Sequence, residues 1–243
     1  MTSAIRDLEN VKTLKHELSE MLKSYKYGLD EIFSKVTTVK QAFEYNHGSY
    51  PIEHIKTRLK TPESILNKML RKGYPLTLET IHHHIRDIAG IRITCSFVSD
   101  IYKISNLLQQ QEGIQVVETK DYIKKPKPNG YQSLHLILKY PAHGSDKIEN
   151  IYVEIQIRTI AMDFWACLEH KIYYKYDGDV PKKLVQDLKE AADTVASLDK
   201  KMEQIHNDVV QLKNTDENDE DTHKRHNHLR MSLPINFFSL NSG

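Results

Sequence analysis

Hydrophobic and polar residues alternate without interruption from Ile151 to Arg158, and this pattern predicts a β-strand with one buried face. The hydrophobic positions are Ile151, Val153, Ile155 and Ile157. The other face carries Tyr152 and then a carboxylate, an amide and a guanidinium, from Glu154, Gln156 and Arg158. Because a solvated strand face usually mixes polar residue types without order, this row of functional groups on a rigid strand indicates a binding surface.

Alternating segments elsewhere predict four more strands, at residues 52–60, 91–97, 114–122 and 131–140. Segments with helical spacing lie between them, at residues 62–72, 78–86, 101–110 and 159–174. Thr61 before Pro62 is typical of a helix N-cap, and Gly73 is typical of a helix end. Together these segments predict an α+β fold in which a mixed five-stranded sheet is flanked by helices.

Long helical segments are predicted at both ends of the chain. Residues 4–47 are expected to form two helices that separate near Gly28, and residues 184–212 carry a heptad-like hydrophobic stripe. This stripe can pack against the N-terminal helices of the same chain or against another subunit, and both interpretations stay open. Residues 214–243 contain an acidic run and then a His-rich basic run, and are predicted to be a disordered tail.

These boundaries predict four parts of the chain. They are N-terminal helices over 1–48, a central domain over 50–180, a C-terminal helix over 181–213 for packing or oligomerisation, and the tail over 214–243. With 243 residues, the chain is long enough to bury a stable core.

Composition narrows the function classes only in part. The chain has 34 Lys and Arg against 33 Asp and Glu, so no overall field directs it to nucleic acid or to a membrane. The sequence has no apolar run long enough to span a bilayer and no signal-peptide core. Cys95 and Cys167 form no disulfide framework, which favours a reducing cytoplasm as the location.

A basic surface is predicted on the first strand and on the helix that follows it. One face of the strand carries only basic residues and the helix adds two more: His54, Lys56, Arg58, Lys60, Lys68 and Arg71. An isolated run of charge is usually no more than a solvated face. Matching basic faces on two consecutive elements favour a bound polyanion such as a triphosphate.

Two carboxylates are candidates for metal-assisted chemistry. Asp87 directly precedes the second strand, where a carboxylate can hold Mg²⁺ against phosphate oxygens, although a lone aspartate there is more often a cap. Glu154 and Arg92 lie on strands of the same predicted sheet, which makes metal-assisted phosphoryl transfer the predicted reaction class. The run from His82 to His84 predicts no metal site, because adjacent helical residues point in different directions.

A second nucleotide site is predicted at the Lys- and Pro-rich loop that runs from Lys124 to Tyr131. Its lysines suit phosphates and Tyr131 suits stacking on a base, although a strand tyrosine can equally serve packing alone. Six candidate residues lie on non-core strand faces by alternation: Arg58, Arg92, Tyr131, His135, Glu154 and Gln156. One side of the sheet is therefore predicted to face two nucleotides.

Six segments match one known family when they are taken in order: Thr57-Arg58-Leu59-Lys60, Arg86-Asp87-Ile88-Ala89-Gly90-Ile91-Arg92, Lys127-Pro128-Asn129-Gly130-Tyr131-Gln132-Ser133-Leu134-His135, Glu154-Ile155-Gln156-Ile157-Arg158-Thr159, Ala161-Met162-Asp163-Phe164-Trp165 and Glu169-His170-Lys171-Ile172-Tyr173-Tyr174-Lys175-Tyr176. They resemble the RelA/SpoT-type alarmone synthetases, and residues 50–180 carry the resemblance. The size fits the single-domain small alarmone synthetases, and residues 154–176 are most similar to the RelP branch. The resemblance implies a nucleotidyltransferase-like synthetase fold for the central domain.

This family transfers pyrophosphate from ATP to the 3′-hydroxyl of GTP or GDP, giving (p)ppGpp and AMP, with Mg²⁺ as cofactor. The resemblance implies that Asp87 and Glu154 are catalytic and hold the metal, and that Glu154 also activates the acceptor hydroxyl. On the ATP side it implies Arg58 and Arg92 around adenine, and Lys60, Ser64, Lys68 and Arg71 on the phosphates. On the GTP or GDP side it implies Tyr131 stacked on guanine, Asp163 reading the base, and Lys125, Lys127, His135, Gln156 and Arg158 along the phosphates and ribose.

The hydrolase domain of bifunctional relatives uses a His-Asp motif, which this sequence lacks and has no room for, so we expect no alarmone hydrolysis. The resemblance also implies a homotetramer that acts in stringent-response signalling in the cytoplasm. Two alternatives are another metal-dependent nucleotidyltransferase and an RNA-binding module on the same fold. RNA binding is the less favoured prediction, because Asp87 and Glu154 would repel RNA phosphates.

Overall fold

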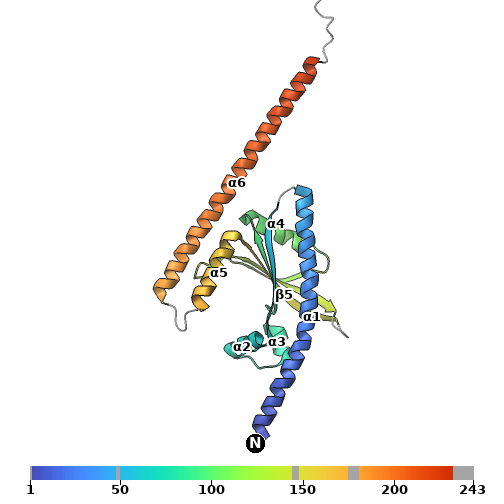
Figure 1. The fold of residues 1–243 in the computed structure, drawn as a ribbon, viewed down its shortest axis with the longest axis vertical. Coiled ribbons are helices and arrows are strands. Elements are labelled where there is room, and N and C mark those ends of the chain that lie inside the picture. The colour runs from blue at the N-terminus through green and yellow to red at the C-terminus, as the bar shows by residue number, and fades with distance from the viewer. Residues whose placement is uncertain (1, 48–49, 144–147, 175–180, 232–243) are drawn as a thin grey trace, which may run out of the picture. The chain divides into compact units, whose positions relative to one another are not determined.

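The structure is a computed structural model that describes residues 2–47, 50–143, 148–174 and 181–231 (Figure 1). Its helices are α1 (Thr2–His47), α2 (Pro62–Lys72), α3 (Leu78–His84), α4 (Val98–Gln109), α5 (Ile160–Tyr174) and α6 (Lys182–Met231). Its strands are β1 (Ile52–Leu59), β2 (Ala89–Cys95), β3 (Gln115–Asp121), β4 (Leu134–His143) and β5 (Ile148–Thr159). The chain divides into two units, residues 1–199 and 200–243, and the first holds the whole sheet.

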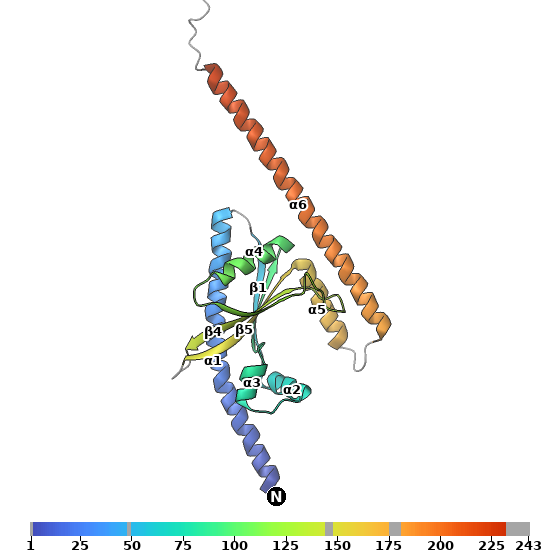
Figure 2. The same ribbon diagram turned by 180° about the vertical axis from the view of Figure 1, so that it is seen from behind.

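The five strands form one sheet in the order β1-β2-β5-β4-β3. β2 runs parallel to β5, and the other neighbouring strands are antiparallel. The predicted α+β fold with a mixed five-stranded sheet is therefore confirmed. β5 lies at the centre of the sheet (Figure 2). Its residues therefore have neighbours on β2 and on β4.

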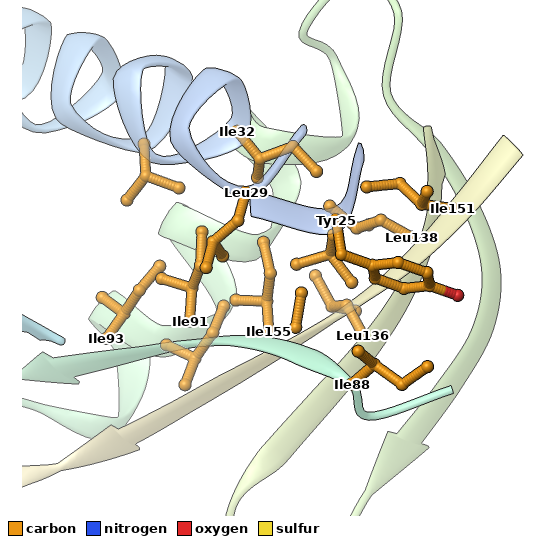
Figure 3. Close-up of a cluster of buried hydrophobic side chains, with 14 of the residues drawn as sticks. Tyr25, Leu29, Ile32, Ile88, Ile91, Ile93, Leu136, Leu138, Ile151 and Ile155 are labelled. Atoms are coloured by element: carbon orange, nitrogen blue, oxygen red, sulfur yellow. The ribbon is translucent and has the colours of Figure 1, made fainter. Parts of the chain in front are cut away.

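One face of the sheet is covered by hydrophobic side chains from α1. In Figure 3, Leu29 and Ile32 of α1 lie near Ile91 of β2 and Ile155 of β5, and all four side chains are buried. The alternation along β5 is confirmed, because its four predicted core residues have exposed fractions of 1% or less. The polar residues at the intervening positions must therefore lie on the opposite face of the sheet.

The prediction of two helices that separate near Gly28 is wrong, because α1 is continuous from Thr2 to His47. Gly28 instead lets the helix approach the sheet. A Cβ atom at this position would lie 2.4 Å from Ile151 Cδ1 and 3.3 Å from Ala142 Cβ. Glycine inside an exposed helix is less favourable than alanine by about 1 kcal/mol. The close packing against the sheet explains why glycine is nevertheless present at position 28.

β4 begins at Leu134, whereas alternation predicts a strand from Tyr131. A tight turn precedes the strand: Gly130 has a φ of 88° and its backbone N–H donates to the Lys127 carbonyl at 2.8 Å. The Tyr131 N–H donates to Asn129 Oδ1 at 3.2 Å rather than to a neighbouring strand. The backbone of Tyr131 is thus held by the loop and not by the sheet ladder.

The first part of α6 carries the beginning of the predicted hydrophobic stripe. Leu188 and Ala192 are buried together with Trp165 of α5, and the Trp165 indole donates to the Leu188 carbonyl at 3.0 Å. The helix continues to Met231, so residues 214–231 are helical where a disordered tail is predicted. That segment contains no glycine or proline to end the helix. Residues 232–243 lie outside the described part of the chain.

In the second unit, the stripe residues Met202, Ile205, Val209 and Leu212 are exposed. None of the helices in the described part of the chain is long and apolar enough to cross a bilayer.

Candidate active site

A pocket of about 250 Å³ lies on the sheet face opposite α1. It is lined by Lys56, Thr57, Arg58, Gly90, Ile91, Arg92, Glu154 and Gln156. Gly90 of β2 is paired in register with Arg58 of β1 on one side and Glu154 of β5 on the other. Since Gly90 has no side chain, the space between Arg58 and Glu154 stays open.

Arg58 and Arg92 are diagonal neighbours, because Arg58 pairs with Gly90 and Lys56 pairs with Arg92. Diagonal positions on an antiparallel pair are ~7–8 Å apart. A planar ring held between two guanidinium groups needs about twice the ~3.5 Å contact distance between carbon atoms. The register thus suits the predicted clasp around a flat heterocycle.

Asp87 lies between two lysines at one end of this face. Its Oδ2 accepts from Lys60, which directly follows β1, and its Oδ1 accepts from Lys68 of α2 at 2.7 Å. Burial alone would raise the pKa of Asp87, but the hydrogen bonds from the two lysines hold it below the ordinary value. Asp87 is therefore an ionised carboxylate at neutral pH.

α2 is positioned by its own N-cap, since Thr61 Oγ1 accepts from the Ser64 N–H at 3.3 Å. Buried Ile65 and Met69 fix one side of this helix, and Lys68 reaches Asp87 from it. Ser64 and Arg71 are exposed on α2. Neither makes a described contact with the cluster of Lys60, Lys68 and Asp87.

Glu154 accepts two hydrogen bonds from its neighbours on the sheet. His135 Nδ1 lies 3.0 Å from Oε1, and Gln156 Nε2 donates to Oε2 at 2.9 Å. Burial would raise the pKa of Glu154, but the contacts with His135 and Gln156 bring it below the ordinary value. The sequence alone does not show whether the pKa of Glu154 is raised. In the structure, this pKa is lowered.

Arg158 is only 2% exposed, although alternation places it on the open face of β5. The alternation is correct, but α5 and the loop before β4 cover this end of the strand. Arg158 donates to Gln156 Oε1 and, at 3.4 Å, to the Tyr131 hydroxyl. Its Nη1 lies 3.3 Å from Asp163 Oδ1, and burial lowers its pKa without removing its charge at neutral pH.

Asp163 of α5 is shared between two guanidinium groups. Its Oδ1 lies 3.3 Å from Arg92 Nη1 and 3.3 Å from Arg158 Nη1. Arg92 lines the pocket between β1 and β5, and Arg158 lies beside Tyr131. One carboxylate therefore connects the two regions that are predicted to take different nucleotides.

Tyr131 and its loop form the far side of the site. The Tyr131 ring packs near Tyr122, His135 and Trp165, and Lys127 Nζ lies 4.6 Å from its ring centre. Burial raises the pKa of the Tyr131 hydroxyl, so it stays protonated at neutral pH. Lys125 in the same loop is exposed.

The donor set suits a small hard cation. Within the described residues, no cluster of three or more His, Cys, Asp or Glu side chains is arranged for a metal ion. Mg²⁺ is usually held by one or two carboxylates together with substrate phosphates and water. Asp87 and Glu154 would supply such a pair, and the negative charge of Asp87 acts against the lowering of the Glu154 pKa.

His82 and His84 do not converge on one point. His82 Nε2 lies 2.7 Å from the Asn150 carbonyl, whereas His84 stacks on Tyr74 with ring centres 4.7 Å apart. Three residues that line the pocket are not among the predicted site residues, namely Thr57, Gly90 and Ile91, and of these Gly90 is the one that leaves space for a ligand. Its position between two charged neighbours in a sheet is the signal that could have identified it.

Residues 57–179 match the family model described as a region found in RelA and SpoT proteins. The chain is similar to the GTP pyrophosphokinase YwaC of Bacillus subtilis, with 49% identity over 86% of this chain and 100% of the relative. Among solved structures it is similar to small alarmone synthetase 1 of Bacillus subtilis bound to its product pppGpp, with a TM-score of 0.74, 37% identity and coverage of 80% and 99%. Small alarmone synthetase 2 of Bacillus subtilis gives a TM-score of 0.71 at 49% identity, with coverage of 79% and 99%.

Proposed function

This chain belongs to the RelA/SpoT family of alarmone synthetases, and we propose that it transfers pyrophosphate from ATP to the 3′-hydroxyl of GTP or GDP, releasing AMP. The observation that carries this proposal is the pocket on the open face of β1, β2 and β5. Guanidinium groups from Arg58 and Arg92 line it together with Glu154, and the ionised Asp87 lies near enough to Glu154 to interact with it.

The donor nucleotide is assigned to the β1, β2 and α2 side. The spacing of Arg58 and Arg92 suits adenine between them, and we assign the phosphates to Lys60, Ser64, Lys68 and Arg71. In support, Lys60 and Lys68 both bind the anionic oxygens of Asp87. Phosphate oxygens offer the same lysines equivalent charge-assisted acceptors.

The acceptor nucleotide is assigned to the β4, β5 and α5 side. Tyr131 would stack on guanine, and Asp163 would accept hydrogen bonds from the guanine N1–H and amino group. We assign the phosphates and ribose to Lys125, Lys127, His135 and Gln156, and the resemblance adds Arg158. Lys127 lies over the Tyr131 ring here, so stacking of a base on that side requires this lysine to move, as its exposure permits.

Asp87 and Glu154 are the residues that would hold Mg²⁺ with the ATP phosphates. The ion, when bound, would neutralise charge on the β-phosphate under attack. We assign Glu154 the role of general base for the acceptor 3′-hydroxyl, since its lowered pKa leaves it ionised and able to accept a proton. Because its pKa is lowered, Glu154 is a weak base, and positioning and charge neutralisation would contribute to the rate beside it.

Family membership also supports a cytoplasmic homotetramer of the RelP branch that acts in the stringent response. The exposed apolar residues of α6 are compatible with a subunit interface. Sedimentation that finds only monomer at working concentration would contradict the tetramer.

Incubation with ATP, Mg²⁺ and either GTP or GDP, followed by anion-exchange chromatography, tests the proposed reaction. We expect (p)ppGpp and an equal amount of AMP. Release of pyrophosphate instead of AMP would identify a nucleotidyltransferase. Salt-sensitive binding of single-stranded RNA without nucleotide turnover would support the RNA-binding alternative.

A further inference from the structure

Glu154 and four neighbouring side chains form a closed hydrogen-bonded ring with two branches, both of which begin at Arg158. In the first branch, Arg158 donates to Gln156 Oε1, and Gln156 Nε2 donates to Glu154 Oε2 at 2.9 Å. In the second, Arg158 lies 3.4 Å from the Tyr131 hydroxyl, which lies 2.8 Å from His135 Nε2, and His135 Nδ1 lies 3.0 Å from Glu154 Oε1.

The chemistry of the two end groups fixes the direction of every bond in this ring. A guanidinium only donates hydrogen bonds and a carboxylate only accepts them. Gln156 must therefore turn its carbonyl to Arg158 and its amino group to Glu154. The Tyr131 oxygen accepts from Arg158, so its own proton goes to His135 Nε2. In the neutral imidazole the remaining proton is then on Nδ1, where it is donated to Glu154.

Burial makes this arrangement persistent. Arg158 is 2% exposed and His135 is 7% exposed, so water competes little for their hydrogen bonds. Asp163 and the face of the Tyr131 ring, 5.7 Å from the guanidinium carbon, hold Arg158 from other sides. Arg158 cannot turn toward a substrate phosphate without leaving these partners. Lys125, which is exposed on its loop, has no such restraint.

We propose that Arg158 is a positioning residue for Glu154 rather than a ligand of the acceptor phosphates. It acts through Gln156 on one carboxylate oxygen and through Tyr131 and His135 on the other, and so holds the carboxylate in one orientation. This inference rests on the proposed function, in which Glu154 serves the acceptor hydroxyl. It replaces the phosphate-binding role that sequence resemblance implies for Arg158.

Two substitutions test the ring from different points. Arg158→Met removes the donor from which both branches begin. Tyr131→Phe breaks the second branch but keeps the aromatic side chain that would stack on guanine. For each variant, kcat is measured with saturating ATP and Mg²⁺, and the Kd for GDP is measured by calorimetry. Lys125→Met is the matched control, because it removes an exposed cation that is assigned directly to the phosphates.

Loss of the positioning bonds is expected to lower kcat by about 10- to 100-fold in both variants, with the Kd for GDP nearly unchanged. Lys125→Met should instead raise the Kd for GDP, as expected of a residue that contacts the phosphates directly. If Arg158→Met instead weakens GDP binding and keeps its kcat, Arg158 is a phosphate ligand and the proposal is overturned. If Arg158→Met does not fold, Tyr131→Phe decides alone, and a normal kcat in that variant refutes the proposal.

A spectroscopic readout separates this inference from the proposed function. In the nucleotide-free full chain with ¹⁵N-labelled histidine, His135 is expected to carry its proton on Nδ1, and Nε2 is expected to show the shift of a hydrogen-bonded acceptor. Tyr131→Phe should move the Nε2 resonance toward that of a free ring nitrogen. A proton on Nε2 in the unsubstituted chain would overturn the ring whatever the enzyme makes. Absence of alarmone product with an intact His135 signature would overturn the proposed function alone.

Discussion

Glu154→Gln separates the chemistry at this site from nucleotide binding. The substitution keeps the size of the side chain but removes its charge, and it replaces one acceptor oxygen by a donating amino group. Both carboxylate oxygens face donors, His135 on one side and Gln156 on the other, so the new amino group must oppose one of them. Loss of a general base typically costs 10²- to 10⁴-fold in rate, which corresponds to ~2.7–5.4 kcal/mol of transition-state stabilisation.

The expected result is a turnover number lower by about 10³-fold, with little change in affinity for ATP or GDP. Turnover is followed as AMP and (p)ppGpp on anion exchange, and affinity is followed by calorimetry with the non-reacting single nucleotides. Glu118→Gln is the matched control, since it makes the same change on β3 at a partly exposed carboxylate that pairs with Arg86 and Lys120. That variant should turn over at the normal rate.

Two results would refute this reasoning. If Glu154→Gln keeps more than a tenth of normal turnover, the carboxylate is not the group that activates the acceptor. If it loses GDP affinity as strongly as turnover, Glu154 is a binding residue whose removal disturbs the pocket as a whole.

The remaining predictions concern charge, stacking and packing. Asp87→Asn should lose Mg²⁺-dependent turnover, and unchanged turnover across a Mg²⁺ titration would assign the metal elsewhere. Tyr131→Ala should weaken GDP binding by ~1–3 kcal/mol and leave ATP binding nearly unchanged in calorimetry, because one base loses its stacking partner. Asp87 and Glu154 both have lowered pKa values, so the stability that each contributes is present above its ordinary value of 3.8 or 4.5 and is lost as the pH falls through its folded-state pKa. Denaturant titrations between pH 7 and 3 should therefore show a smaller loss of stability in Glu154→Gln than in the unsubstituted chain. Gly28→Ala should lower the free energy of unfolding by about 1–3 kcal/mol, because its Cβ would lie 2.4 Å from Ile151 Cδ1; an unchanged melting temperature would contradict this packing.

Hydrophobic periodicity predicted the sheet well, because each strand has one face in the core. The alternation along β5 and β2 correctly assigns Glu154 and Arg92 to the face opposite α1. Helix ends were predictable where a local signal exists, as at Thr61 and at Gly73, whose φ is 68°. Gly28 led to the wrong prediction of two helices. A glycine inside a helical segment suggests a helix break unless it is known that a strand packs closely against it.

Arg158 shows the limit of the same reasoning at the candidate active site. Alternation gives the side of the sheet on which a residue lies, but it does not say what covers that side. Asp163 of α5 and Tyr131 of the loop before β4 both close over Arg158, and only the tertiary fold brings them there. A charged residue predicted at an open surface is thus a buried donor with several acceptors. Such burial is unfavourable unless the charge is paired and hydrogen-bonded. Asp163 supplies the opposite charge, and Gln156 and Tyr131 accept hydrogen bonds from Nη2, whereas Nε has no described acceptor.

The tertiary fold also distinguishes the two pairs of lysines that are assigned to the two nucleotides. Lys60 and Lys68 come from elements that converge on Asp87, so the fold and this ion pairing set their positions. Lys125 and Lys127 lie on a loop whose backbone is held by its own turn, and their side chains are exposed. A preformed cation pair suits a phosphate chain that must be held in one geometry for attack, whereas exposed loop lysines suit an acceptor that is present as either GTP or GDP. Under the proposed reaction, we therefore expect the loop to allow either GTP or GDP as the acceptor. We expect the sheet to fix the geometry of the transfer.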